Sequence, residues 1–260
     1  MKSPAKLLAL VSALSVVAAT SAFADGTIQF GHDNPNYRSG SGGEFTVKVT
    51  NAGGDTDHIM DLYPTSGNAT KVAWYNSSNV ASGLGIETFC LQKTEYMNFN
   101  TTFWYSISDY AKGSTGYTPD HISRGTAYLF GLFAQGLLTD YTYAPGSGRA
   151  ADAATLQHAI WYLEGEETLA AAGGSGVGGN KFLNDVITIY GSLTTAGYDS
   201  FANQGVEVLN LASSAANATA GNWDAQDQLI WPSVPDAATT VALLGVSLLG
   251  LAGFRRKFVK

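Results

Sequence analysis

The sequence predicts an α+β protein in which an antiparallel β-sandwich or barrel packs on a small helical subdomain. Two observations carry this prediction. Residues 27–110 and 205–231 contain short segments in which apolar and polar residues alternate, which is the period of a strand with one buried face. Residues 118–196 instead carry apolar residues at helical spacing. The period changes near Pro119 and changes back near Gly205, so helices should lie between two groups of strands.

Composition limits the class of protein. The 260 residues carry a net charge of −7, only 13% are charged, and 12% are aromatic. An acidic chain without a basic patch is a poor partner for phosphate backbones, which argues against nucleic-acid binding. Thirty glycines together with many aromatic residues are typical of a β-rich domain with many turns. The length is sufficient to bury a core without disulfides.

The first 24 residues predict a signal peptide. Lys2 and Lys6 precede an apolar run from Leu7 to Ala19, and Ala22-Phe23-Ala24 supplies the small residues before a cleavage site at Asp25. We therefore expect an extracellular domain over residues 25–231.

Residues 234–260 predict a C-terminal sorting signal. Val234-Pro235-Asp236 precedes an apolar segment, 237–254, that is long enough for a transmembrane helix, and a basic end starts at Arg255. This arrangement resembles the PEP-CTERM signals that exosortases recognise in Gram-negative bacteria, in particular the variant that opens Val-Pro-Asp-Ser-Gly. Ala237-Ala238 replace the Ser-Gly of that variant. The alternative is a plain membrane tail.

The expected strands lie on both sides of the helical region. We predict them, from their alternation, at residues 27–30, 44–50, 84–96, 102–107, 205–211 and 226–231. Cys90 lies in the third strand, where Phe89 and Leu91 should face one layer and Cys90 the other.

Three helices are expected. The first spans 121–138, with Thr118 as N-cap and Pro119 as first helical residue. The second spans 153–167 with Asp152 as N-cap, and the third spans 181–196. Residues 170–179, rich in Gly and Ala, should form a loop. On the second helix, Gln157 shares one face with Ile160 and Trp161.

Cys90 is the only cysteine of the chain, so it cannot form an internal disulfide. A buried cysteine and a hydrogen-bonded glutamine are each ordinary when taken alone. Together, the Phe89-Cys90 pair and the later run Leu156-Gln157-His158-Ala159-Ile160-Trp161 resemble the motifs of thioester domains in Gram-positive surface adhesins. Leu156 departs from the threonine of that family.

The resemblance implies an internal crosslink between Cys90 and Gln157, and covalent capture of a surface amine by the protein. It also implies that the strand and helix layers meet at this pair. Phe89, Trp161 and Trp104 are candidate walls that would exclude water. His158 is adjacent to Gln157 but points about 100° away on a helix, which argues against an acid–base role.

Three classes of function remain open: a surface-anchored thioester adhesin, a non-covalent structural or glycan-binding protein of the exopolysaccharide matrix, and an enzyme. The enzyme class is disfavoured, because no Ser-His-Asp order, phosphate loop or cysteine-protease signature occurs. Asp55, Asp57, His58 and Asp61 could suggest a metal site, but their spacing fits no EF-hand pattern and loop acids of this kind are more often solvated, so we expect no metal and no cofactor. The expected partners are an unknown surface protein or amine-bearing ligand, an exosortase, the membrane through the C-terminal helix, and exopolysaccharide.

Overall fold

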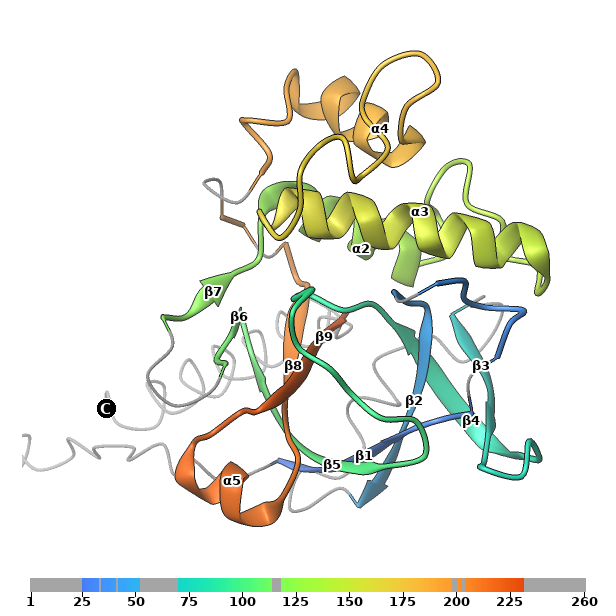
Figure 1. Cartoon of the computed structure of the whole chain (residues 1–260), viewed down its shortest axis with the longest axis vertical. Helices are drawn as coiled ribbons and strands as arrows, with labels where there is room; N and C mark the ends of the chain where they lie inside the picture. The colour runs from blue at the N-terminus through green and yellow to red at the C-terminus, as the bar shows by residue number, and fades with distance from the viewer. Residues whose placement is uncertain are drawn as a thin grey trace, which may run out of the picture.

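The computed structural model describes residues 25–32, 34–40, 42–51, 70–113, 118–197, 201–202 and 204–231. Within these residues a seven-stranded antiparallel sheet has the strand order β3-β4-β2-β1-β5-β8-β9. The sheet curls into a half-barrel, and helices cover one of its ends (Figure 1). The structure thus has an antiparallel sheet with a few helices, as predicted, and the single curled sheet corresponds to the barrel-like alternative.

The strands follow the predicted alternation wherever one face is buried. In β1, Ile28 and Phe30 are fully buried, and the strand pairs with β2 on one side and with β5 on the other. The strand bounds are β1 Gly26–Phe30, β2 Phe45–Asn51, β3 Lys71–Tyr75, β4 Ala81–Thr88, β5 Thr102–Ser108, β6 Tyr110–Ala111, β7 Asp120–His121, β8 Glu207–Ala212 and β9 Ala225–Ile230. β6 and β7 form a separate two-stranded sheet.

The predicted strand at 84–96 ends earlier than expected. β4 stops at Thr88, and Cys90 forms an isolated bridge with Gln228 of β9. The Leu91 N–H donates to the Asp227 carbonyl at 3.0 Å, and the Leu229 N–H donates to the Phe89 carbonyl at 2.9 Å. The segment after β4 therefore crosses to β9, which draws the two sides of the curled sheet together.

The helices are α2 Arg124–Ala134, α3 Ser147–Leu163, α4 Lys181–Tyr190 and the short α5 Ala215–Ala220. α2 and α3 lie side by side over the end of the half-barrel, and α4 packs outside them (Figure 1). The ring of Phe89 meets that of Phe133 on α2 at 4.9 Å, so the sheet and the helices share one core.

The predicted starts of two helices are wrong. Asp120 and His121 pair with β6, and Ser123 caps α2 by accepting a hydrogen bond from the Thr126 N–H. Thr118 therefore caps no helix. α3 begins at Ser147, so Asp152 lies inside it and pairs with Lys181 at 2.6 Å. The third helix ends at Tyr190 because Gly191 adopts the left-handed conformation that terminates a helix.

No helix within the described part of the chain is long and apolar enough to cross a membrane. The predicted signal peptide, the C-terminal sorting segment and the acidic cluster around Asp57 lie outside the described residues.

Candidate functional site

Cys90 and Gln157 are brought together where the sheet meets the helices. Cys90 lies two residues beyond β4, and Gln157 lies in the middle of α3, 67 positions later in the chain. Both residues are fully buried. The predicted meeting of the strand and helix layers at this pair is therefore present in the structure.

Two hydrogen bonds join the backbone of Cys90 to the side-chain amide of Gln157. The Cys90 N–H donates to Gln157 Oε1 at 3.0 Å, and Gln157 Nε2 donates to the Cys90 carbonyl at 2.8 Å. A third hydrogen bond comes from the Gly43 N–H to Gln157 Oε1 at 3.1 Å. The amide oxygen thus accepts from two backbone N–H groups, which is the donor arrangement of an oxyanion hole.

Gly42 and Gly43 allow this close approach. A Cβ atom at Gly42 would lie 2.3 Å from Gln157 Cγ and 2.9 Å from a ring carbon of Trp161. A Cβ atom at Gly43 would lie 2.8 Å from the Phe45 ring. Side chains at these positions would therefore displace Gln157 or the start of β2. Sequence reasoning missed both glycines, although their place directly before an alternating strand was a usable signal.

The sulfur of Cys90 lies in a dry environment with one amide donor. Gln228 Nε2 donates to Cys90 Sγ at 3.7 Å, and the Thr88 hydroxyl donates to Gln228 Oε1 at 3.0 Å, which orients that amide. Burial raises the pKa of the Cys90 thiol to about 12, although the Gln228 hydrogen bond acts in the opposite direction. Cys90 is therefore a neutral thiol at physiological pH in this environment.

The three candidate wall residues have different positions. Phe89 is fully buried against Phe133 of α2, and Trp161 is 2% exposed on the same helix as Gln157. Trp104 packs with the smaller cluster that contains Trp223. The structure therefore brings Trp161 to the pair. Phe89 lies in the core that the sheet and the helices share, and Trp104 lies outside that core.

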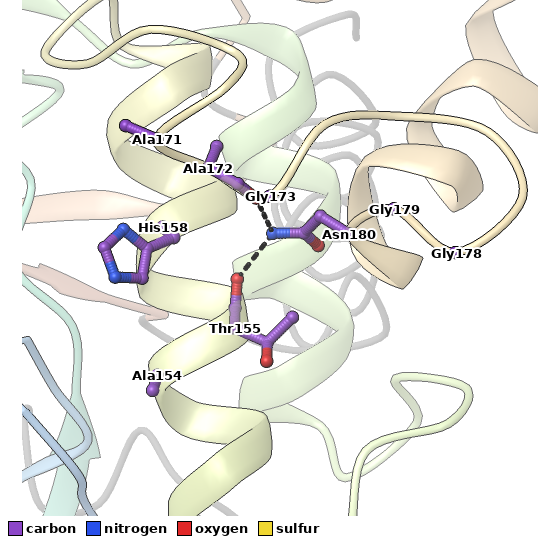
Figure 2. A pocket seen from close by; sticks show the side chains of 9 residues that line it. All are labelled: Ala154, Thr155, His158, Ala171, Ala172, Gly173, Gly178, Gly179 and Asn180. Carbon is purple, nitrogen blue, oxygen red and sulfur yellow. Dashed lines mark hydrogen bonds between the residues drawn. The ribbon is translucent and has the colours of Figure 1, made fainter.

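His158 lines a shallow pocket of about 310 Å³ next to the glycine-rich loop that leads to α4, and neither Cys90 nor Gln157 contributes to the wall of that pocket. The His158 ring meets the Trp161 ring edge-on at 5.5 Å. In that pocket Asn180 Nδ2 donates to the carbonyls of Thr155 and Ala172, which ties the loop to the helix (Figure 2). His158 Nδ1 lies 2.9 Å from Glu167 Oε1.

A buried ion pair supports Gly42 and Gly43, which we call the glycine segment. Arg149 of α3 contacts both carboxylate oxygens of Glu44, the residue after Gly43, and the Tyr141 hydroxyl donates to Glu44 at 2.8 Å. Burial raises the pKa of Glu87 nearby to about 8, and the negative charge of Glu44 adds to the increase. The carboxyl groups of Glu44 and Glu87 and the guanidinium group of Arg149 are thus buried close together.

A cavity of about 270 Å³ lies beside the pair. Phe45 and Trp161, which flank the glycine segment and Gln157, form part of its wall, and Glu95 and Tyr96 form another part. The Trp161 indole N–H is buried and has no hydrogen-bond partner among the described residues.

Among the described residues, no three His, Cys, Asp or Glu side chains are grouped so that they could hold a metal ion. The groups that meet at the Cys90–Gln157 pair are a thiol, an amide and backbone N–H donors.

Comparison with known proteins identifies the C-terminal segment. Residues 233–258 match the VPDSG-CTERM motif. Neither the curated proteins nor the solved structures contain a match to this chain. The motif overlaps the sorting segment predicted at 234–260 and is consistent with processing by an exosortase. The chain is accordingly an exported, surface-targeted protein with a VPDSG-CTERM sorting signal.

Proposed function

We propose that this surface-associated protein forms an internal thioester between Cys90 Sγ and Gln157 Cδ, and that it uses this bond to capture an amine covalently as an adhesin. The observation that supports the proposal best is the position of the Gln157 amide oxygen. It accepts hydrogen bonds from the N–H groups of Cys90 and Gly43, one of which belongs to the attacking residue itself.

The arrangement suits attack on an amide, which is a weak electrophile. Negative charge develops on the carbonyl oxygen when sulfur adds to Gln157 Cδ, and two fixed backbone donors stabilise that charge. Because two hydrogen bonds already hold the Cys90 backbone against the Gln157 amide, these two residues also lose little further entropy on reaction.

The proposed reaction is balanced without a further reagent. The Cys90 thiol loses its proton and forms a bond from sulfur to Gln157 Cδ, the Cδ–Nε2 bond breaks, and the thiol proton leaves with the nitrogen as ammonia. Because burial disfavours a free thiolate, proton transfer accompanies attack, and the Gln228 amide stabilises the charge that develops on sulfur.

In amine capture, the sulfur of Cys90, which is the nucleophile in thioester formation, becomes the leaving group. A primary amine adds to the thioester carbonyl, the C–S bond breaks, and the products are an amide on Gln157 and a free Cys90 thiol. Complete burial of both residues protects the thioester from hydrolysis before capture. The incoming amine would approach through the cavity at Phe45 and Trp161. Each molecule acts once, so we propose no turnover enzyme.

The intact mass of freshly purified protein tests the bond. The unaltered chain should weigh one ammonia less than its sequence, and methylamine should add to it stoichiometrically. Cys90→Ala and Gln157→Ala should each have the full sequence mass and take up no methylamine. Asn210→Ala is a matched control, because it removes a buried amide of β8 whose hydrogen bonds go to Ser108 and Lys112 and not to the pair. A full sequence mass for the unaltered, folded chain at every stage of purification would refute the proposal.

A non-covalent glycan-binding role in the exopolysaccharide matrix is the second candidate. Tyr96, which is 82% exposed at the cavity beside the pair, favours it, since sugar rings stack on exposed aromatic side chains. If binding to a glycan array depends on Tyr96 and survives Cys90→Ala, the second role applies.

A further inference from the structure

A second cavity, which we call the acidic pocket, lies next to the one at Trp161. It has a volume of about 570 Å³, and Gln92, Glu95, Asp120 and Glu166 contribute to its wall. Glu95 lines both cavities, so they adjoin there. The volume is within the range of binding sites for small molecules.

Three carboxyl groups reach the acidic pocket from different parts of the fold. Glu95 follows β4, Asp120 begins β7, and Glu166 follows α3. Burial and the charge of Glu166 raise the pKa of Glu95 to about 7 and that of Asp120 to about 6. Further charges act on these two groups: Asp224 raises the pKa of Glu95, and His121 lowers that of Asp120.

The lysines that lie closest in sequence to Glu95 and Asp120 form their contacts with other residues. Lys93 Nζ pairs with Glu167 at 2.6 Å and lies over the ring of Trp161. Lys112 Nζ donates to Ser106 Oγ at 2.7 Å and lies over the ring of Trp223. Among the described residues, no lysine, arginine or histidine contributes to the wall of the acidic pocket.

Unsatisfied acceptors are an independent sign of a ligand. Gln92 is only 9% exposed, and its Oε1 has no hydrogen-bond partner; Glu95 Oε2 is also buried without one. A buried oxygen that is left without a donor lowers the stability of the fold. An amide oxygen and carboxylates can only accept, so the missing group must be a hydrogen-bond donor, and the surrounding acids favour a positive one.

Within the part of the chain that the structure describes, no three His, Cys, Asp or Glu side chains are grouped so that they could hold a metal ion. A primary alkylammonium group instead presents three N–H donors in divergent directions and suits acceptors that are spread around a cavity. We propose that the acidic pocket binds a primary alkylammonium group, carried by a small diamine or by a lysine side chain. Binding at this site needs no thioester, although its position beside the cavity at Trp161 would concentrate amines near Gln157.

The test uses the full chain with Cys90→Ala, which cannot form a thioester, so that its outcome is separate from that of the proposed capture reaction. Titration calorimetry with cadaverine and with Nα-acetyl-lysine methylamide should show binding of at least one of them. Binding of cadaverine alone would indicate that the pocket takes a small diamine. Binding of the lysine derivative would indicate that it takes a lysine side chain of a protein. The neutral isostere 1,5-pentanediol should not bind.

Glu95→Gln and Asp120→Asn should each weaken binding by about tenfold or more, because each removes a charge-assisted hydrogen bond. Neither change should impair folding, since each replaces an acid whose ionised form is disfavoured by burial. Glu207→Gln is the matched control, because Glu207 is a half-buried acid on β8 outside the pocket and should leave the affinity unchanged. Absence of binding by both amines, equal binding of the diol, or equal effects of Glu95→Gln and Glu207→Gln would overturn the proposal.

Discussion

Arg149 forms a buried ion pair with Glu44, which lies 105 positions earlier in the chain. This ion pair sets the position of Gly42 and Gly43 against α3. Arg149 Nε donates to Glu44 Oε2 at 2.8 Å, and both side chains are at most 1% exposed. Glu44 follows Gly43 directly, and Arg149 precedes Gln157 on α3 by about two helical turns. The ion pair therefore fixes both the donor and the acceptor of the Gly43–Gln157 hydrogen bond.

Replacing Arg149 with Met should destabilise the protein by about 3–5 kcal/mol, because it leaves the Glu44 carboxylate buried without its partner. Urea unfolding followed by circular dichroism measures the loss. The double change Glu44→Gln with Arg149→Met should cost less than the sum of the two single changes. Lys181→Met is the control, since it breaks a partly exposed pair with Asp152 and should cost about 1 kcal/mol or less. A similar loss in both Met variants would contradict the assigned role.

Gly42→Ala should prevent the pair from reacting. The added methyl group would overlap Gln157 Cγ and the Trp161 ring, so Gln157 must move off its two backbone donors. We expect the full sequence mass and loss of methylamine uptake in this variant. Gly131→Ala is the matched control, because its Cβ would meet only Val206 at 3.8 Å and it lies within α2. Normal methylamine uptake by Gly42→Ala would show that the close approach is not needed.

Gln228→Leu should slow thioester formation by about tenfold, which corresponds to the loss of one hydrogen bond to the developing charge on sulfur. The rate is measured by intact mass as loss of ammonia when chain that was isolated unfolded from inclusion bodies, and still has the full sequence mass, is refolded. Gln226→Leu, on the same strand, removes a buried hydrogen bond to the Gln92 carbonyl and not one to sulfur. Equal rates in the two variants would exclude a role for Gln228 in the reaction.

Glu87 should make the protein less stable as the pH rises. Its pKa is raised from 4.5 in the unfolded chain to about 8 in the folded protein, so the folded protein holds the proton more tightly. The stabilisation is complete below pH 4.5 and is lost as the pH rises through 8. Glu87→Gln keeps an acceptor for the Thr46 hydroxyl and removes the charge. The variant should exceed the unaltered protein in stability by at least about 1 kcal/mol at pH 8.5, and match it near pH 4.5. A variant that is less stable at pH 8.5 would contradict this explanation.

Local sequence patterns predicted much of the fold. Alternation located β1, β2, β5, β8 and β9 to within a few residues, although β8 and β9 are buried on both faces. The start of the first helix was wrong because a tertiary contact decides it. Asp120 pairs with Ala111 of β6, so the chain is still extended where Thr118-Pro119 suggested a helical turn.

For the candidate site, the sequence predicted that Cys90 and Gln157 meet and that Trp161 lies beside them. Cys90 and Gln157 carry recognisable residue types on the two elements that meet. Gly43 and Gln228 contact the same pair through distant segments, and no local spacing relates them to it. The Glu44–Arg149 ion pair was equally hidden, since charge pairing over 105 positions depends on the completed fold.

The crossing of the Cys90 segment to β9 has a mechanical consequence. β9 ends at Ile230, and the matched sorting motif begins at residue 233, so a pull on the C-terminal segment would be applied first to this strand. β8 pairs with β9 along one side, and Phe89 and Leu91 hold its other side by backbone hydrogen bonds. A force along the strand would load these bonds together in shear instead of breaking them one by one. The strand that takes the tension is also the strand that holds Cys90 in place.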